Sequence, residues 1–233
     1  MILMRTRATE LAELMDDPDC DLGLLESTYA QFGPLNRLLS GWKRLWATRI
    51  RPYVVRGETF RVLDLGSGGG DLARNLAAWA ARGGFDVQVT AADPDPRASA
   101  FARRHPWPRV TYVSTTSAAL ADEGAQYDIV VSNHVMHHLD GDSFGRILAD
   151  CEALAPRALH SDLRRSPVSY ALYGLGTLPW ARSSFIRTDG MRSIRRSFTP
   201  PELRLAAPPG WRVEADPPFR LLLTRGLNRS EHG

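Results

Sequence analysis

The sequence predicts an α/β protein, a three-layer Rossmann-like sandwich in which helices cover both faces of a mostly parallel sheet. Short apolar segments with strand character alternate along the chain with segments of helical periodicity, the pattern typical of such sheets. A glycine-rich turn, Gly66 to Gly70, separates the first of these strands from a helix that begins near Asp71. Polar residues follow later strands, at the edge where a parallel sheet places its ligands. One domain with appendages accounts for all 233 residues.

Composition narrows the classes of partner. The net charge of +3 comes almost wholly from arginines that are dispersed rather than gathered in a block, so nucleic acid is not an expected partner. Cys20 and Cys151 are far apart and have no C-x-x-C neighbour, which indicates neither disulfides nor a zinc site and fits a reducing cytoplasm. Because no uncharged stretch of 18 residues and no apolar leader occur, we expect no membrane span and a cytoplasmic location.

Residues 1–50 are predicted to form an N-terminal helical cap on a domain that spans residues 51–233. Helical periodicity runs from Leu22 to Ile50, and the Gly33-Pro34 pair is expected to break it into two helices. The second helix carries an apolar stripe that must pack against another element. Its members are Leu35, Leu38, Leu39, Trp42, Leu45 and Trp46.

The glycine-rich turn suits a nucleotide-like cofactor, because residues without a Cβ tolerate positive φ angles and the next helix offers free N–H groups. The dinucleotide fingerprint G-x-G-x-x-G/A does not match, since its third glycine position holds Asp71. A Walker loop does not match either, because Lys43 is the only lysine in the chain. What remains is acid-x-G-x-G-x-G, in which Asp64 can receive a cationic amine.

This motif, Asp64-Leu65-Gly66-Ser67-Gly68-Gly69-Gly70, resembles the first motif of the class I S-adenosylmethionine-dependent methyltransferases. The resemblance implies a seven-stranded sheet whose last strand is antiparallel. It also implies S-adenosyl-L-methionine as the cofactor. The expected contacts in the turn are Asp64, Gly66, Ser67 and Gly68.

The next two strand segments, 87–93 and 109–114, supply further expected cofactor contacts. Asp93 stands at the carboxyl end of the first segment, where a carboxylate can accept both hydroxyls of a ribose. Pro94 follows it in the same crevice. Many class I methyltransferases carry an aspartate near Thr116 for the adenine amino group. This chain lacks that aspartate, so Thr116 is the expected substitute.

The strand from Tyr127 ends in a polar cluster of Asn133, His134, His137 and His138. The pattern N-x-x-x-H-H-L resembles the fourth-motif region of small-molecule methyltransferases, which implies that Ser132 and Asn133 line the cofactor. His134 is also an expected cofactor contact. His137 first and His134 second are predicted as the general base that faces the acceptor; alternatively, the histidines only form hydrogen bonds within the wall. No metal site is predicted, because adjacent rings should point apart and no nearby cysteine or acidic pair completes a ligand set.

The rest of the chain is expected to close the sheet and cover the site. Asp142 is predicted to cap a helix with an apolar face, and a fifth strand spans residues 158–163. Residues 164–198 form an aromatic and basic insert that we interpret as a lid. A capping box from Thr199 to Glu202 begins another helix, and the two final strands form an antiparallel pair.

Two segments resemble a narrower group. Residues 29–46 resemble the N-terminal part of the UbiE-type quinone-biosynthesis C-methyltransferases, in which these helices cover the cofactor and the substrate mouth. Residues 189–198 resemble a segment of bacterial secondary-metabolism relatives of that group, which favours an O-methylated phenol, quinol or polyketide-derived acceptor. Two alternatives stay open: C-methylation in quinone biosynthesis, and a non-catalytic S-adenosylmethionine-binding regulator.

The acceptor mouth is expected to be aromatic-lined and mostly apolar, because tyrosines and tryptophans gather in the N-terminal helices and in the lid. A flat, partly hydrophobic small molecule fits such a mouth best. The expected acceptor contacts are Tyr29, Tyr170, Tyr173 and Arg192. A monomer or a homodimer is expected.

Overall fold

The computed structural model describes residues 4–227 and contains a seven-stranded sheet in the order β3-β2-β1-β4-β5-β7-β6. The parallel strands are β1 (Thr59–Leu65), β2 (Asp86–Asp93), β3 (Val110–Ser114), β4 (Ile129–Asn133) and β5 (Ala158–Leu163). β7 (Arg220–Arg225) runs antiparallel between β5 and β6 (Arg212–Asp216). The predicted α/β class and the antiparallel last strand are confirmed.

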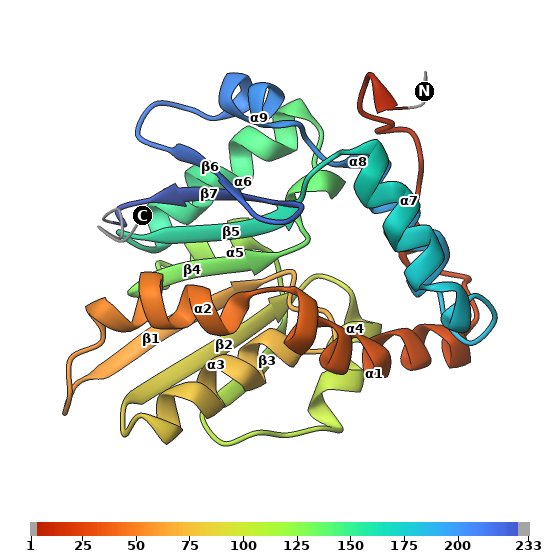
Figure 1. Cartoon of the computed structure of the whole chain (residues 1–233). Helices are drawn as coiled ribbons and strands as arrows, with labels where there is room; N and C mark the ends of the chain where they lie inside the picture. Colours follow the sequence, from red (N-terminus) through yellow and green to blue (C-terminus); the bar gives the residue numbers. More distant parts are fainter. Residues whose placement is uncertain (1–3, 228–233) are drawn as a thin grey trace.

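Helices cover both faces of the sheet and complete three layers (Figure 1). The first face carries α2 (Trp42–Leu45), α3 (Asp71–Arg82) and α4 (Pro96–Arg103). The second face carries α5 (Ser117–Asp122), α6 (Gly141–Leu154) and α9 (Pro200–Ala206). Side chains alternate along β1, so Val62 joins the first core and Leu63 the second. Both are fully buried, as expected for a strand covered on both faces.

The N-terminal helix α1 (Leu22–Leu39) passes through Pro34, so the predicted break at Gly33-Pro34 is wrong. Pro34 is exposed and has no backbone N–H, so the helix lacks one hydrogen bond there. Packing of α1 against α3 and α4 nevertheless holds the helix together. The chain turns instead at Gly41, whose φ of 67° favours glycine. The side chains of Leu35, Leu38 and Leu39 lie outside the described part of the structure, whereas Trp42, Leu45 and Trp46 are buried in the first core.

One of the two predicted helix caps is confirmed. The capping box of Thr199 and Glu202 begins α9. In α6 the cap is Asp140 rather than Asp142, because Asp140 Oδ1 accepts a hydrogen bond of 2.8 Å from the backbone N–H of Ser143. Asp142 lies in the first turn of the helix, where its carboxylate faces the positive end of the helix dipole.

The predicted lid insert contains two helices, α7 (Pro167–Gly176) and α8 (Ile186–Arg196). Both stand beyond the carboxyl ends of the strands, and the N-terminal segment, residues 4–21, runs beside them (Figure 1). A hydrogen bond from the backbone N–H of Ala8 to the carbonyl of Arg195 joins this segment to α8. Among residues 4–227, no helix has both the length and the apolar character needed to cross a bilayer.

Candidate active site

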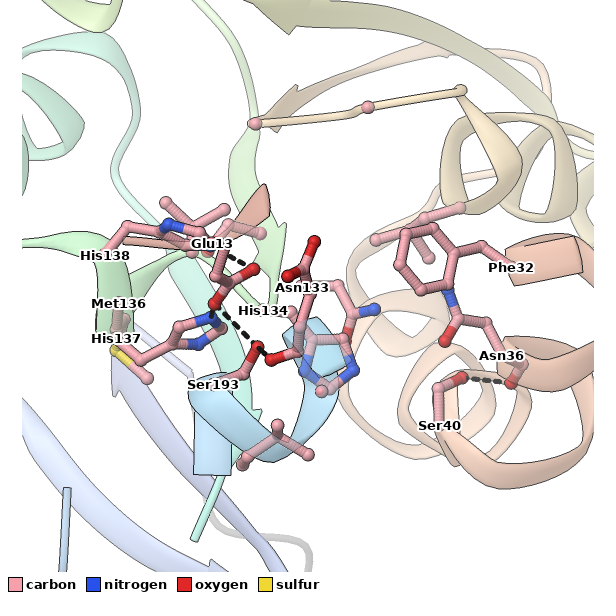
Figure 2. Close-up of a pocket in the computed structure, with 18 of the residues that line it drawn as sticks. Glu13, Phe32, Asn36, Ser40, Asn133, His134, Met136, His137, His138 and Ser193 are labelled. Carbon is pink, nitrogen blue, oxygen red and sulfur yellow. Dashed lines mark hydrogen bonds and ion pairs between the residues drawn. The ribbon is translucent and has the colours of Figure 1, made fainter. Parts of the chain in front are cut away.

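A cavity of about 1040 Å³ opens at the carboxyl ends of β1, β2, β4 and β5. The strand order reverses between β1 and β4, and this switch point is where open α/β sheets bind ligands. Figure 2 shows Glu13, His137, His138 and Ser193 on one side of the cavity and Phe32, Asn36 and Ser40, from α1 and its end, on the other.

The glycine-rich turn needs glycine for two separate reasons. Gly66 has a φ of 64°, and a Cβ built there would lie 2.5 Å from Val135 Cγ2. Gly70 has a φ of 75°, and its Cβ would lie 2.5 Å from the ring of Tyr112. Any side chain would therefore meet both an unfavourable backbone and a steric clash. The turn backbone lines the cavity through Gly66, Ser67, Gly68 and Gly69.

Asp64 lies beneath this turn and is almost fully buried. Its Oδ2 atom has no hydrogen-bond partner within residues 4–227. Burial raises the pKa of Asp64 well above its ordinary value, and the nearby carboxyls of Asp71 and Asp93 raise it further. A buried acceptor oxygen without a donor, in a group of carboxyls that lines the cavity, suits a cationic ligand.

Asp93 ties the end of β2 to the turn. Its Oδ2 accepts a hydrogen bond of 2.8 Å from the backbone N–H of Gly68, and its Oδ1 accepts one of 2.9 Å from that of Asp95. A carboxylate has about four acceptor positions, so both oxygens can still bind a ligand hydroxyl. Pro94 lines the cavity beside it. Thr116 also lines the cavity, but its hydroxyl already accepts a bond of 3.2 Å from Ala119 as the cap of α5.

The end of β4 is fixed by two side-chain hydrogen bonds. Trp42 Nε1 donates to Asn133 Oδ1 at 2.9 Å, which orients the amide from α2. Ser132 Oγ lies 2.7 Å from His160 Nδ1 on β5. The imidazole of His160 is buried and has a pKa lowered to about 4 by that burial, so it is neutral at pH 7. These contacts hold the floor of the cavity in one arrangement.

His134 follows directly and has an unusual backbone. Its φ is 62°, a value that few residues other than glycine adopt. The ring lines the cavity, and its buried Nδ1 has no hydrogen-bond partner in the described chain. Burial lowers the pKa of His134 to about 4, against the opposing charge of Asp162. The imidazole is therefore neutral at pH 7 and can accept a proton.

His137 differs from His134 in charge. Its Nδ1 lies 2.7 Å from Asp162 Oδ1, its Nε2 lies 3.2 Å from Glu13 Oε1, and its side chain is 1% exposed. Burial alone would lower the pKa of His137, but the two carboxylates together raise it to about 10. The ring is thus an imidazolium at pH 7 and has no free position for a proton. This arrangement does not fit the role of general base predicted for it.

The N-terminal segment forms part of the cavity wall, which sequence reasoning missed. Glu13 Oε1 accepts a hydrogen bond of 2.7 Å from Ser193 Oγ on α8. Asp189 of α8 accepts bonds of 2.8 and 3.0 Å from the backbone N–H groups of Leu14 and Met15. These partners are far apart in the chain, and residues 4–21 show no periodicity that would have revealed them.

Two arginines complete this attachment from opposite sides. Arg7 in the segment donates to the backbone carbonyls of Leu139 at 3.1 Å and Arg196 at 2.7 Å. Arg196 in turn donates to the carbonyls of Leu11 at 2.6 Å and His137 at 3.2 Å. The segment is therefore bound both to α8 and to the loop after β4.

The four predicted acceptor residues divide into two pairs. Tyr29 and Tyr173 line the cavity, whereas Tyr170 and Arg192 are not among the described residues that line it. Tyr29 lies against the glycine turn, since a Cβ on Gly69 would lie 3.0 Å from its Cβ. Arg192 donates instead to the carbonyl of Ala12 at 2.6 Å, which holds the N-terminal segment. Tyr173 is fixed by a hydrogen bond of 2.8 Å from its hydroxyl to the carbonyl of Ile186.

Comparison with known proteins agrees with this architecture. Residues 62–156, which carry β1 to β4 with their helices, match the family model described as a methyltransferase domain. Residues 62–156 are thus similar to a methyltransferase domain. The glycine turn, Asp93 and the end of β4 all fall within the matched residues.

Two curated relatives of this methyltransferase domain are named ubiquinone biosynthesis O-methyltransferase. The protein from Methylocella silvestris is 37% identical over 159 residues, which cover 64% of this chain and 56% of that protein. The protein from Roseobacter denitrificans is 35% identical over 152 residues, which cover 58% of each. The chain thus spans little more than half the length of these relatives.

Solved structures of low sequence identity share the fold. The plantazolicin methyltransferase BpumL, solved with a triazolic desmethylPZN analog and SAH, has a TM-score of 0.65 at 14% identity and covers 93% of both chains. Magnesium protoporphyrin IX methyltransferase from Synechocystis PCC 6803, solved with SAM, has a TM-score of 0.51 at 15% identity and covers 85% of this chain and 82% of its own. At such identities the likeness concerns the fold alone.

Proposed function

We propose that this protein transfers the methyl group of S-adenosyl-L-methionine to an oxygen atom of a small aromatic acceptor. One observation carries the proposal: a single cavity of about 1040 Å³ runs from the glycine turn and Asp93 to the wall formed by the N-terminal segment and α8. Sites for one drug-sized ligand measure roughly 300–1,000 Å³. The cavity therefore has room for a cofactor and an acceptor side by side.

The residues of the cofactor end match the groups that S-adenosylmethionine offers. The partnerless Oδ2 of Asp64 suits the cationic amino-acid end, and the remaining acceptor positions of Asp93 suit the ribose hydroxyls. Gly66, Ser67, Gly68 and Gly69 line the cavity, so a ligand chain can lie close to their backbone. When bound, the cofactor supplies an electrophilic methyl group on a sulfonium. The protein then has to align the acceptor oxygen and exclude water.

We assign the general base to His134 rather than to His137. The neutral imidazole of His134 lines the cavity and has a buried Nδ1 without a partner. A phenol keeps its proton at pH 7, so a neutral imidazole within reach can accept that proton as the new O–C bond forms. His137 is already protonated between two carboxylates, and its proposed part is to hold the wall in place.

An aromatic acceptor fits the lining of the cavity. Tyr173, Trp180, Phe32 and Phe144 face the cavity, together with the apolar side chains of Leu139 and Leu172. Flat rings pack favourably against such a surface. The names of the curated relatives point in the same direction, since both are O-methyltransferases of ubiquinone biosynthesis. A monomer or homodimer and a cytoplasmic location stay predictions.

The two alternatives differ in what they require of the acceptor side. A regulator that only senses S-adenosylmethionine needs no acceptor site, so the continuous cavity and the His134 Nδ1 atom without a hydrogen bond favour an enzyme. C-methylation uses the same activated phenolate, and the names of the curated relatives favour oxygen over carbon. The position of the transferred methyl in the product separates the two reactions.

The cofactor assignment can be tested by calorimetry. We expect S-adenosylhomocysteine to bind with one site per chain and Asp93→Ala to weaken binding about 10- to 100-fold, because charged hydrogen bonds contribute roughly 1.5–3 kcal/mol each. Asp122→Ala, which removes an exposed carboxylate from α5, serves as the control and should leave the affinity unchanged. Absence of heat with the wild-type protein would contradict the assignment.

The catalytic assignment can be tested with pooled phenols, quinols and amines, with formation of S-adenosylhomocysteine as the readout. We expect turnover on a phenol or quinol and a loss of about 10² to 10⁴ in kcat for His134→Asn, the usual range for a general base. Affinity for S-adenosylhomocysteine should stay within a factor of three, and His105→Gln, outside the cavity, should behave as wild type. Methylation of amines alone would refute the aromatic acceptor.

A further inference from the structure

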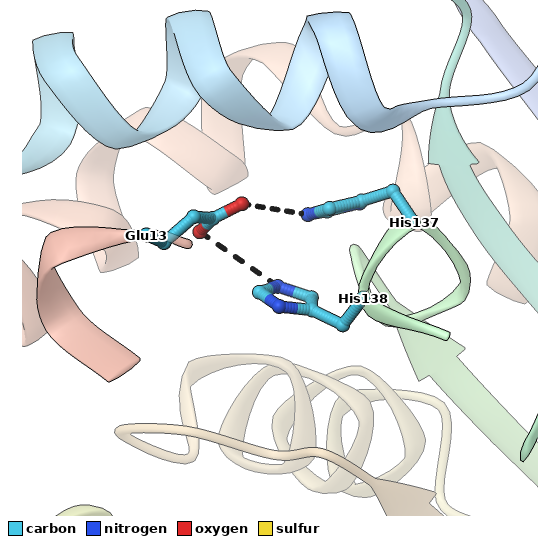
Figure 3. A group of neighbouring side chains, drawn as sticks. All are labelled: Glu13, His137 and His138. Carbon is cyan, nitrogen blue, oxygen red and sulfur yellow. Dashed lines mark ion pairs between the residues drawn. The ribbon is translucent and has the colours of Figure 1, made fainter. Parts of the chain in front are cut away.

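Three side chains meet at one corner of the cavity, and we call them the Glu13 group: Glu13, His137 and His138. Nε2 of His137 lies 3.2 Å from Glu13 Oε1, and Nε2 of His138 lies 3.7 Å from Glu13 Oε2 (Figure 3). The two rings lie 4.3 Å apart between centroids. They do not point apart as expected, because the residues lie on a short 3-10 turn after β4 that directs both toward the N-terminal segment.

The Nδ1 atom of each histidine faces a second carboxylate. His137 Nδ1 lies 2.7 Å from Asp162 Oδ1, and His138 Nδ1 lies 3.3 Å from Asp16 Oδ2. A carboxylate at Nδ1 fixes the ring orientation and leaves Nε2 as the outward nitrogen, an arrangement that recurs behind metal-bound histidines. Glu13 is held as well, because its Oε1 accepts a hydrogen bond of 2.7 Å from Ser193. All three members of the group are thus oriented toward one point.

The Nε2 atom of His137, which faces this point, has no hydrogen-bond partner of normal geometry in the described chain. The side chain of His137 is only 1% exposed. Glu13, at 4% exposed, is also buried. Burial of a polar nitrogen without a hydrogen bond is costly. A ligand that binds to His137 Nε2 would remove this cost.

We propose that the Glu13 group binds a divalent transition-metal ion of the zinc class. Catalytic zinc sites use three protein ligands, often two histidines and a glutamate, and leave a fourth coordination position open. Imidazole nitrogens favour such ions over magnesium or calcium. They bind metal only as neutral rings, so the ion would displace the Nε2 proton of His137 into solvent. The three ligand atoms lie within 4.8 Å of one another. Tetrahedral ligands about 2.1 Å from the metal lie roughly 3.4 Å apart, so binding draws the group together by about an ångström.

The open position of this ion faces the cavity, because all three members of the group line it. The ion would bind a water molecule there, or an acceptor oxygen, whose proton it would make easier to remove. This second step rests on the proposed function, whereas binding of the ion does not. The ion would also join the N-terminal segment to the loop after β4.

The test uses the full chain without an affinity tag, treated with EDTA and titrated with Zn²⁺ or Co²⁺ in the absence of cofactor and acceptor. We expect one ion per chain by calorimetry and the visible absorption bands of tetrahedral Co²⁺. Glu13→Gln and His138→Ala should each weaken binding at least 10-fold, and Asp16→Asn about 10-fold, the lower end of effects from residues behind the ligands.

His105→Gln is the matched control, because this exposed histidine lies outside the cavity and should not affect the ion. His138 is 30% exposed, so its alanine variant should keep the fold, which circular dichroism checks. Absence of stoichiometric binding would overturn the proposal. Binding that both Glu13→Gln and His138→Ala leave unchanged would do so as well. Metal binding without methyl transfer would leave the site intact and refute only the proposed function.

Discussion

The two ends of the cavity are built in different ways. The cofactor end lies at the glycine turn and Asp93, and the acceptor end lies at the wall formed by the N-terminal segment and α8. At the cofactor end, the contacts join residues close in sequence or on adjacent strands: Gly68 to Asp93 across β1 and β2, and Asp95 to Asp93 two residues away. At the acceptor end, the wall joins the first residues of the described chain to α8, with Glu13 and Ser193 separated by 180 positions. The cofactor end therefore depends on backbone geometry, and the acceptor end on distant side chains.

This difference indicates that the two ends can be disturbed separately. A change in the glycine turn should affect cofactor affinity first. A change in the attachment of the N-terminal segment should affect the acceptor wall while the cofactor still binds. The following predictions test this separation, beginning with the largest expected effect.

Gly66→Ala should affect the cofactor end most strongly. Alanine at a φ of 64° is strained by about 1–2 kcal/mol, and the clash of its Cβ with Val135 at 2.5 Å adds about 1–3 kcal/mol. We expect affinity for S-adenosylhomocysteine to fall about 100-fold by calorimetry. Gly124→Ala is the matched control, because its φ is 69° but no atom lies within 4 Å of the added Cβ. Equal losses in both variants would mean that steric space at the turn is irrelevant.

Asp189→Ala should loosen the attachment of Leu14 and Met15 to α8 and leave the cofactor end intact. The variant removes both acceptors of the Leu14 and Met15 N–H groups, a loss of about 2 kcal/mol in the local opening free energy. Native-state hydrogen exchange at these two amides should become about 30-fold faster. Affinity for S-adenosylhomocysteine should stay within twofold. A comparable fall in that affinity would show that the two ends are coupled.

The smallest expected effect concerns how the free energy of unfolding depends on pH. Burial lowers the pKa of His134 and His160 to about 4, so between pH 6.5 and 4 the unfolded chain binds protons that the folded chain does not. The free energy of unfolding should therefore fall as pH falls through this window. His137 acts in the opposite direction, since its raised pKa of about 10 stabilises the fold fully below pH 6.5 and less as pH rises toward 10.

His160→Gln isolates part of this effect. The variant removes one of the two neutral histidines, so its urea-derived stability should decline by about 1.5 kcal/mol less than that of the wild type between pH 6.5 and 5. Comparing the variant with the wild type cancels the contributions of the carboxylates. A parallel decline in both proteins would show that His160 is protonated in the folded state.

The cofactor end was largely predictable from the sequence, and the acceptor end was not. The positions of Gly66, Gly68 and Asp93 follow from a strand that leads into a glycine turn and from the carboxyl end of the next strand, both local patterns. The charge of His137, the predicted base, depends on Asp162 and Glu13. No spacing in the sequence connects these two residues to His137. The helix through Pro34 was missed for a similar reason, because packing against α3 and α4 outweighs the local preference of proline.

The contact between Glu13 and Ser193 has a consequence for synthesis of the chain. At about 5–20 residues per second, a ribosome adds Ser193 roughly 9 to 36 seconds after Glu13, given the 180 positions between them. During that delay residues 4–21 have no α8 to bind, whereas β1, the glycine turn and β2 are synthesised before its midpoint. The nascent protein should therefore acquire its cofactor pocket well before the opposite wall can form. On the proposed function, newly made molecules would pass through an interval in which the methyl donor has a binding site and the acceptor does not.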